Sequence, residues 1–201
     1  MNFLAHLVLA GEDDALRLGA MLGDFVRGRA PLAAFDPDLR TGILLHRHID
    51  SHTDSLPEIA ALREWFPPRF RRYAGIVIDL GIDHELARRW DDYHPQPLSV
   101  FDEEVRRMLA RHQSIVPEEL RRFMAYADRR GLFAAYRDPA EILHSLRGIG
   151  RRLSRPNPLR EADELWPDLQ PLLAANFTAI FGQVQSDVAA WLKSRSTITG
   201  S

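Results

Sequence analysis

Two short stretches of the chain place acids and histidines four residues apart. His46 and Asp50 stand in the first, GILLHRHIDSHTD. Asp79 and Asp83 stand in the second, DLGIDH, with His84 directly after them. Side chains four apart on a helix lie on one face, with about 5–6 Å between their Cβ atoms. Two facing helices would bring these groups to one point, as a mixed nitrogen and oxygen ligand set that suits Mn, Mg, Fe or Zn in a hydrolytic site.

The first stretch holds two columns of polar residues. At 3.6 residues per turn, His46 and His48 point about 200° apart, so only one of them faces a common centre. One column holds His46, Asp50 and Asp54, and the other holds His48 and His52. We predict that the first column faces the metal, because a hard or borderline cation prefers carboxylate beside imidazole. A zinc site on His48 and His52, or a purely solvent-facing position for all of these residues, stays open.

One more acid, Asp24, interrupts an apolar helical pattern over residues 15–28. We predict a buried carboxylate there, which needs a cation, a metal or a proton. His6 lies in the apolar stretch 2–10, where a single histidine is more often a core residue than a ligand. The chain has no GxSxG, P-loop or GxGxxG motif for a nucleophilic serine or a nucleotide. Hydrolysis by metal-bound water is the reaction class that remains.

The composition is that of a soluble globular protein. Of 201 residues, 45% are hydrophobic and 27% charged, which suits one domain. There is no cysteine, so a metal must be held by His, Asp and Glu. The formal charge of −2 gives no overall attraction to nucleic acid. The apolar start, NFLAHLVLA, is too short to span a membrane and lacks the basic region of a signal peptide, so we expect a cytoplasmic protein.

The apolar residues recur with the period of a helix, and no useful length alternates at period 2. We therefore predict an all-α fold, with one domain over residues 1–193 and a frayed tail or expression remnant over 194–201. Asp36 followed by Pro37 starts the helix that carries His46. Gly81 inside the second central helix indicates a close backbone approach. Helices are predicted over residues 2–10, 15–28, 37–55, 58–66, 69–90, 99–111, 117–130, 138–151, 159–165 and 171–192.

Four blocks of the first half resemble the acyl carrier protein phosphodiesterase family in order and spacing. They are MNFLAHLVLA, LGDFVRG, GILLHRHIDSHTD and DHELARRW. The resemblance implies an all-helical bundle similar to the HD-domain phosphohydrolase fold, with a divergent motif order. It also implies a divalent metal, typically manganese. The implied reaction is hydrolysis of holo-acyl carrier protein to the apo form and 4′-phosphopantetheine.

The matching blocks also imply site residues. His6 and Asp79 fall within them, whereas Glu85 stands where the family more often has a bulky apolar residue. At His48 and His52 the family pattern is loose. The metal ligands that the resemblance implies are Asp24, His46, Asp50, Asp83 and His84.

A mechanism follows as a hypothesis. A bound cation lowers the pKa of its water, and the resulting hydroxide attacks phosphorus in line while the serine oxygen of the carrier leaves. Asp79 or Asp83 orients the water. Arg27 and Arg47 neutralise charge on the phosphoryl oxygens.

Acyl carrier proteins are strongly acidic, so the enzyme needs a basic docking face. We expect this face on the arginines before and at the end of the second central helix. Two other functions stay open: an HD-like phosphohydrolase for a nucleotide or other small phosphodiester, and a helical module that binds carrier proteins without turnover. The predicted docking residues are Arg69, Arg71, Arg72, Arg88 and Arg89.

Overall fold

The computed structural model describes residues 1–26, 28 and 30–199, and within them every regular element is helical. The predicted all-α class is confirmed, and none of the described helices is long and apolar enough to cross a membrane. The α-helices are α1 Phe3–Leu9, α2 Asp14–Leu22, α3 Pro37–Ser55, α4 Pro57–Trp65, α5 Ala74–Arg88, α6 Trp90–Tyr93, α7 Leu98–Arg111, α8 Glu118–Arg129, α9 Pro139–Arg152 and α10 Trp166–Thr199. Short 3-10 helices are η1 Ala30–Ala34, η2 Arg71–Tyr73, η3 Ala134–Arg137 and η4 Leu159–Glu164.

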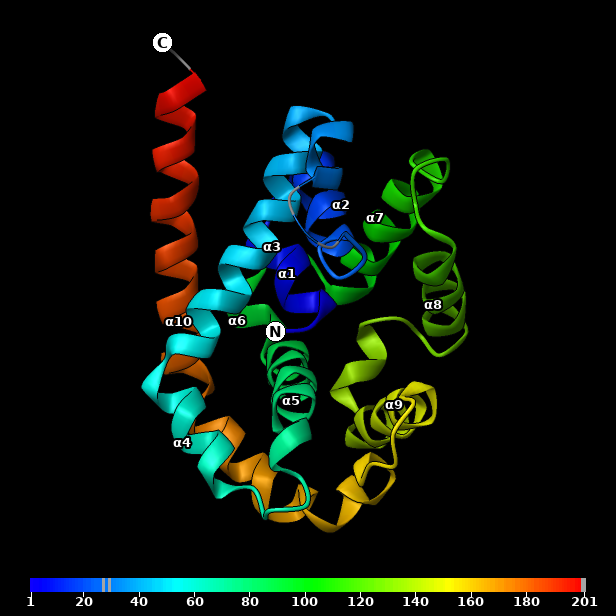
Figure 1. Ribbon diagram of the computed structural model, residues 1–201, viewed down its shortest axis with the longest axis vertical. Helices are drawn as coiled ribbons and strands as arrows, with labels where there is room; N and C mark the ends of the chain where they lie inside the picture. Colours follow the sequence, from blue (N-terminus) through cyan, green and yellow to red (C-terminus); the bar gives the residue numbers. More distant parts are fainter. Residues whose placement is uncertain (27, 29, 200–201) are drawn as a thin grey trace.

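The short helix α1 lies at the centre of the molecule (Figure 1). It packs against α2 and α5, while the long α10 runs along one side against α3, α4 and α5. Nearly all side chains of α1 are buried, including that of His6. A helix that is apolar all round is stable only inside the core, so the FLAHLVL sequence carries a histidine into the interior.

Two glycines let α2 and α3 touch backbone to backbone. A Cβ on Gly19 would lie 2.4 Å from the Leu39 carbonyl oxygen, and one on Gly42 would lie 2.5 Å from the Leu16 carbonyl oxygen. No side chain fits at either position, since such distances lie well inside van der Waals contact. This crossing holds the middle of α2 against the first turns of α3.

The chain leaves α2 earlier than predicted. The helix ends at Leu22 instead of continuing to residue 28, and residues 23–25 form turns. The guanidinium of Arg47 on α3 donates to the carbonyl oxygens of Val26 and Gly28, at 2.7 and 2.8 Å. These carbonyls are therefore bonded across to α3 and not along a helix.

Two other predicted helices also have different bounds. The segment 69–90 divides into η2, α5 and α6, and Gly81 lies within α5 against Leu173 of α10. The last helix begins at Trp166, with Pro171 inside it at the expense of one helical hydrogen bond. It continues to Thr199, into the segment expected as a tail, and residues 200 and 201 lie outside the described part.

Asp102 is a buried acid that joins α7 to η3. Asp102 is 2% exposed, and its carboxylate accepts a hydrogen bond from the backbone N–H of Ala134 at 3.0 Å. Burial raises the pKa of Asp102 to about 6, against the lowering effect of its hydrogen bonds from Ala134 and Phe133. The carboxylate is thus more easily protonated in the folded chain than in the unfolded one.

We expect the free energy of unfolding to fall as the pH rises from about 4 to about 6, because the folded state binds the Asp102 proton more tightly than the unfolded state. The loss should reach up to about 3 kcal/mol and persist above pH 6. Asp102→Asn keeps an oxygen for the Ala134 N–H and cannot ionise, so urea unfolding across this range should show a smaller loss with pH. Asp91→Asn, exposed on α6, is the control. Parallel stability curves for wild type and Asp102→Asn would contradict the assignment.

Candidate metal centre

Three side chains from two helices meet at one point. His6 Nε2 of α1 lies 3.1 Å from Oδ1 of Asp50, which belongs to α3. His46, also on α3, places its Nε2 3.1 Å from Asp50 Oδ2. The two imidazole rings stack with centroids 4.1 Å apart. One ligand atom from each residue lies within 4.8 Å of the others, and no other such group was found among the described residues. The predicted column of His46 and Asp50 therefore faces a shared centre.

His6 completes this group, although the sequence alone favoured a core residue at that position. Both descriptions hold, since the side chain is 1% exposed and also contacts Asp50. The signal that could have found it is a polar residue in a helix that is otherwise apolar all round, within a block that matches the family. Burial alone indicates that a histidine needs a polar partner, but it does not indicate which residue that partner is.

Two more acids border the group. Asp24 Oδ1 lies 3.4 Å from His46 Nε2, and Asp79 Oδ1 lies 3.0 Å from the amino group of Met1, which also contacts Asp50 at 3.3 Å. The prediction that Asp24 is buried was wrong, because α2 ends before it and its side chain is 56% exposed. Asp24 instead lies at the open edge of the centre.

The ring of His46 is held from two sides. A Cβ on Gly23 would lie 2.1 Å from its Cγ atom, so only glycine lets the ring lie against this backbone. Its Nδ1 lies 2.8 Å from the Ala20 carbonyl oxygen and donates to it in the neutral tautomer, which turns the lone pair of Nε2 toward the acids. Second hydrogen bonds of this kind orient metal-binding histidines.

The charges of the group are strongly coupled. Burial alone would lower the pKa of His46, but its hydrogen bonds to Asp24 and Asp50 and their charges raise it to about 9. Burial, together with the charge of His46, lowers the pKa of His6 to about 4. Burial would raise the pKa of Asp50, but the bonds from His46 and His6 hold it well below its usual range. A proton on His46 thus balances the acids, and a divalent cation would displace it.

Asp79 and the amino group of Met1 form the next layer. Burial raises the pKa of the Asp79 carboxyl, against the lowering effect of the Met1 charge. Burial alone would lower the pKa of the amino group, but the charges of Asp79 and Asp50 raise it to about 10. Asp79 of α5 therefore contacts the centre indirectly, through the amino group of Met1, which also contacts Asp50.

Asp83 and His84 do not join the histidine pair. The carboxylate of Asp83 accepts the backbone N–H groups of Leu4 and Ala5, at 2.9 and 3.1 Å, and so caps the first turn of α1. Burial raises the pKa of Asp83 to about 7 against these bonds. His84 Nδ1 lies 2.7 Å from the Tyr136 carbonyl oxygen, and its ring packs edge-on against Trp166.

The second histidine column faces α10. His48 Nε2 lies 2.5 Å from Asp187 Oδ2, and His52 Nδ1 lies 3.6 Å from Asp187 Oδ1. Their ring centroids are 6.4 Å apart, and each of the two rings contacts one oxygen of the carboxylate. The predicted division of α3 into two columns is confirmed, although Asp54 turns to Arg63 at 2.6 Å.

Two arginines, Arg27 and Arg47, are predicted to act in catalysis. Arg27 lies outside the described residues. Arg47 is bonded to the carbonyls of Val26 and Gly28, and so fixes the segment that follows Asp24.

Most of the arginines predicted for docking are engaged within the molecule. Arg88 and Arg89 both pair with buried Glu85, at 3.1 and 3.2 Å. Arg69 pairs with Glu161 at 2.9 Å and also with Glu164. Arg71 donates to the Phe66 carbonyl oxygen at 3.3 Å, while Arg72 is exposed and no such partner is found for it among the described residues. Glu85 thus stands where an apolar residue was expected, and it forms ion pairs with Arg88 and Arg89 there.

Comparisons with known proteins show the family of the chain. The model of the acyl carrier protein phosphodiesterase family matches residues 1–184. A protein of that name from Salmonella agona is 40% identical over 173 residues, covering 84% of this chain and 86% of its own length. One from Shigella boydii is 39% identical over 184 residues and 90% of each chain. No solved structure matches. The chain belongs to the acyl carrier protein phosphodiesterase family.

Proposed function

We propose that this protein hydrolyses the phosphodiester that joins 4′-phosphopantetheine to a serine of holo-acyl carrier protein, with a divalent cation, Mn²⁺, at its centre. The observation that carries the proposal is the meeting of His6, His46 and Asp50 in a chain of this family. The family supplies the substrate class. The meeting of the three side chains supports a hydrolytic cation at this point.

The fit to a cation rests on the chemistry of the donors. His6 Nε2, His46 Nε2 and an oxygen of Asp50 would hold the cation, with Asp24 as a further oxygen ligand at the open edge. A set of two imidazoles and carboxylates suits Mn²⁺ among other divalent ions. When bound, the cation supplies an acidified water and positive charge for the phosphoryl oxygens.

The remaining residues bind a proton or position other residues. Asp79 is the acid that we assign to orienting the attacking water, because both oxygens of Asp83 already accept N–H groups of α1. Burial raises the pKa of Asp79, so its carboxylate accepts a proton more readily than a solvent-exposed one. Arg47 positions the segment of Asp24 through its two carbonyl contacts.

Intact-mass spectrometry of a holo carrier protein tests the proposal. Incubation with this protein and Mn²⁺ should convert the holo mass to the apo mass, and free phosphopantetheine should accumulate in equal amount. Cyclic and linear nucleotides and a chelated sample serve as controls. An unchanged holo mass with the metal-loaded protein, or turnover of nucleotides alone, would overturn the assignment.

A further inference from the structure

We propose that the acidic carrier protein docks on the end of α9, an inference that takes its choice of partner from the proposed function. The surface consists of the segment Arg151, Arg152, Leu153 and Arg155, together with Arg72 of η2. We call it the α9-end surface. All five of these residues are exposed.

The positive charges of this surface are not balanced by the protein itself. Among the described residues, no ion pair is found for Arg72, Arg151, Arg152 or Arg155. The acids nearby are taken by other arginines: Asp163 pairs with Arg147 at 3.4 Å, and Glu161 with Arg69 and Arg160 at 2.9 and 3.2 Å. In a chain with a formal charge of −2, this leaves a local positive field that attracts an acidic partner.

An exposed leucine lies among these arginines. Leu153 is 37% exposed, one of three large apolar side chains that are exposed in the described part of the chain. It follows Arg152 directly and lies two residues before Arg155. An apolar contact at the centre with arginines around it is the usual composition of a protein interface. A surface that bound its partner through charge alone would not need an exposed leucine.

The surface is held rigid although it is exposed. The side-chain amide of Asn157 donates to the carbonyl oxygens of Gly150 and Arg155, at 2.9 and 3.1 Å, and its oxygen accepts the Leu159 N–H at 3.3 Å. The hydroxyl of Tyr73 donates to the Pro156 carbonyl oxygen at 3.2 Å and so joins η2 to this segment. A preorganised surface loses less conformational entropy when a partner binds.

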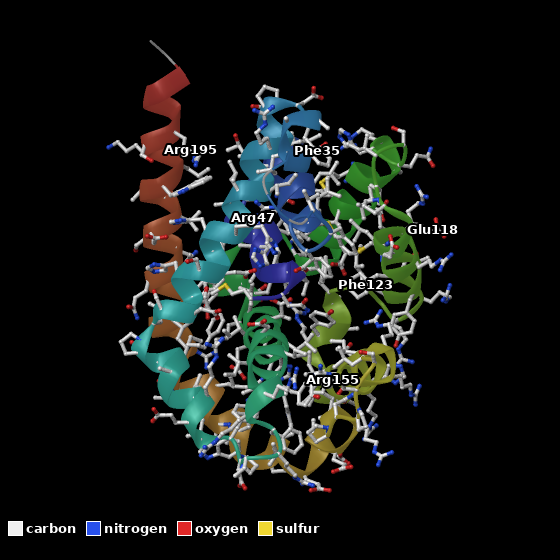
Figure 2. The ribbon with its side chains drawn as sticks, viewed as in Figure 1. Phe35, Arg47, Glu118, Phe123, Arg155 and Arg195 are labelled. Atoms are coloured by element: carbon white, nitrogen blue, oxygen red, sulfur yellow. The ribbon has the colours of Figure 1, made fainter. Side chains whose placement is uncertain are left out.

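The α9-end surface lies on the same side of the molecule as part of α3. In Figure 2, Arg155 lies on the face turned to the reader, as does Arg47, which follows His46 in α3. A carrier protein bound through its acidic side chains to the α9-end surface would thus lie on the side of the molecule on which Arg47 lies. Complementary charge of this kind raises the rate of encounter and fixes orientation more than it adds affinity.

The test compares two double charge reversals. Arg151→Glu/Arg152→Glu removes the surface, and Arg107→Glu/Arg129→Glu is the matched control. Arg129 is likewise an exposed arginine in the last turn of its helix, so the control also removes a favourable charge at a helix C-terminus, one where the surface variant removes two. Arg129 also lies far from the α9-end surface. Its neighbour Arg130 pairs with Glu141, and Glu141 lies about 15 Å along α9 from Arg151.

We expect the KM for holo carrier protein at low ionic strength to rise by about tenfold or more in the surface variant, with kcat unchanged, and to rise far less in the control. Added salt should close the difference. Fluorescence anisotropy with labelled apo carrier protein should show the same loss of binding without any turnover. Thermal melting of each variant reports folding, and Arg155→Glu, outside the helix, repeats the test should the double variant unfold.

The outcomes separate the two proposals. Equal KM values, equal binding and equal salt dependence in the surface and control variants would overturn docking at α9 while leaving the hydrolysis intact. Wild-type protein that binds apo carrier through this surface but releases no prosthetic group would instead overturn the proposed function and support the docking site.

Discussion

Asp50→Asn is expected to reduce the release of phosphopantetheine by at least about a hundredfold, since it removes the one charge that contacts both histidines. The amide has the same shape but repels a cation with its NH₂ group. It also takes away a bond that raises the pKa of His46 to about 9. NMR titration of the metal-free variant should therefore place the His46 pKa lower than in wild type, and Mn²⁺ binding should weaken in parallel.

Asp54→Asn is the matched control for that experiment. It stands one helical turn further on α3, is exposed, and pairs with Arg63 instead of a histidine. Its activity should stay close to wild type, because an exposed ion pair contributes little. Full activity or unchanged Mn²⁺ binding in Asp50→Asn would refute the assignment of the centre.

Gly23→Ala is expected to disable the same centre without changing any ligand. The new methyl group would lie 2.1 Å from Cγ of His46, so the ring or the turn must move. Overpacking of this kind costs about 1–3 kcal/mol of stability. Displacement of a ligand ring should weaken Mn²⁺ binding by roughly ten- to a hundredfold, as loss of an orienting contact does elsewhere. Calorimetric titration with Mn²⁺ and the carrier-protein assay measure the two effects.

Gly148→Ala provides the comparison for Gly23→Ala. A Cβ at position 148, inside α9, meets nothing within 4 Å. The same substitution there should raise stability by up to about 1 kcal/mol through helix propensity and leave Mn²⁺ binding unchanged. Wild-type Mn²⁺ affinity in Gly23→Ala would mean that the close contact does not position His46.

The parts that sequence predicted are those set by local periodicity. The helix from Pro37 to Ser55 has the predicted bounds, because an N1 proline and a following Pro57 mark its two ends, although the Asp36 side chain makes no capping hydrogen bond. Its two columns follow from helical geometry alone, so His46 and Asp50 face one side and His48 the other.

The parts that sequence did not predict depend on contacts between distant segments. Asp83 lies 78 and 79 positions from the N–H groups that it accepts, and nothing local indicates that it caps another helix. The early end of α2 depends on Arg47, which belongs to α3. His6 joins the centre only because α1 is enclosed by its neighbours. Hydrophobic pattern reports which residues are buried, and not which of them meet.

The contact of His48 and His52 with Asp187 has a consequence for the length of the chain. The family match ends at residue 184, whereas Asp187 lies one turn further along α10. A protein shortened to the family-matched length would retain every ligand of the proposed cation. It would nevertheless leave His48 and His52 without the Asp187 carboxylate that they contact, so α3 would lose a polar contact with α10 that lies beyond the family-matched segment.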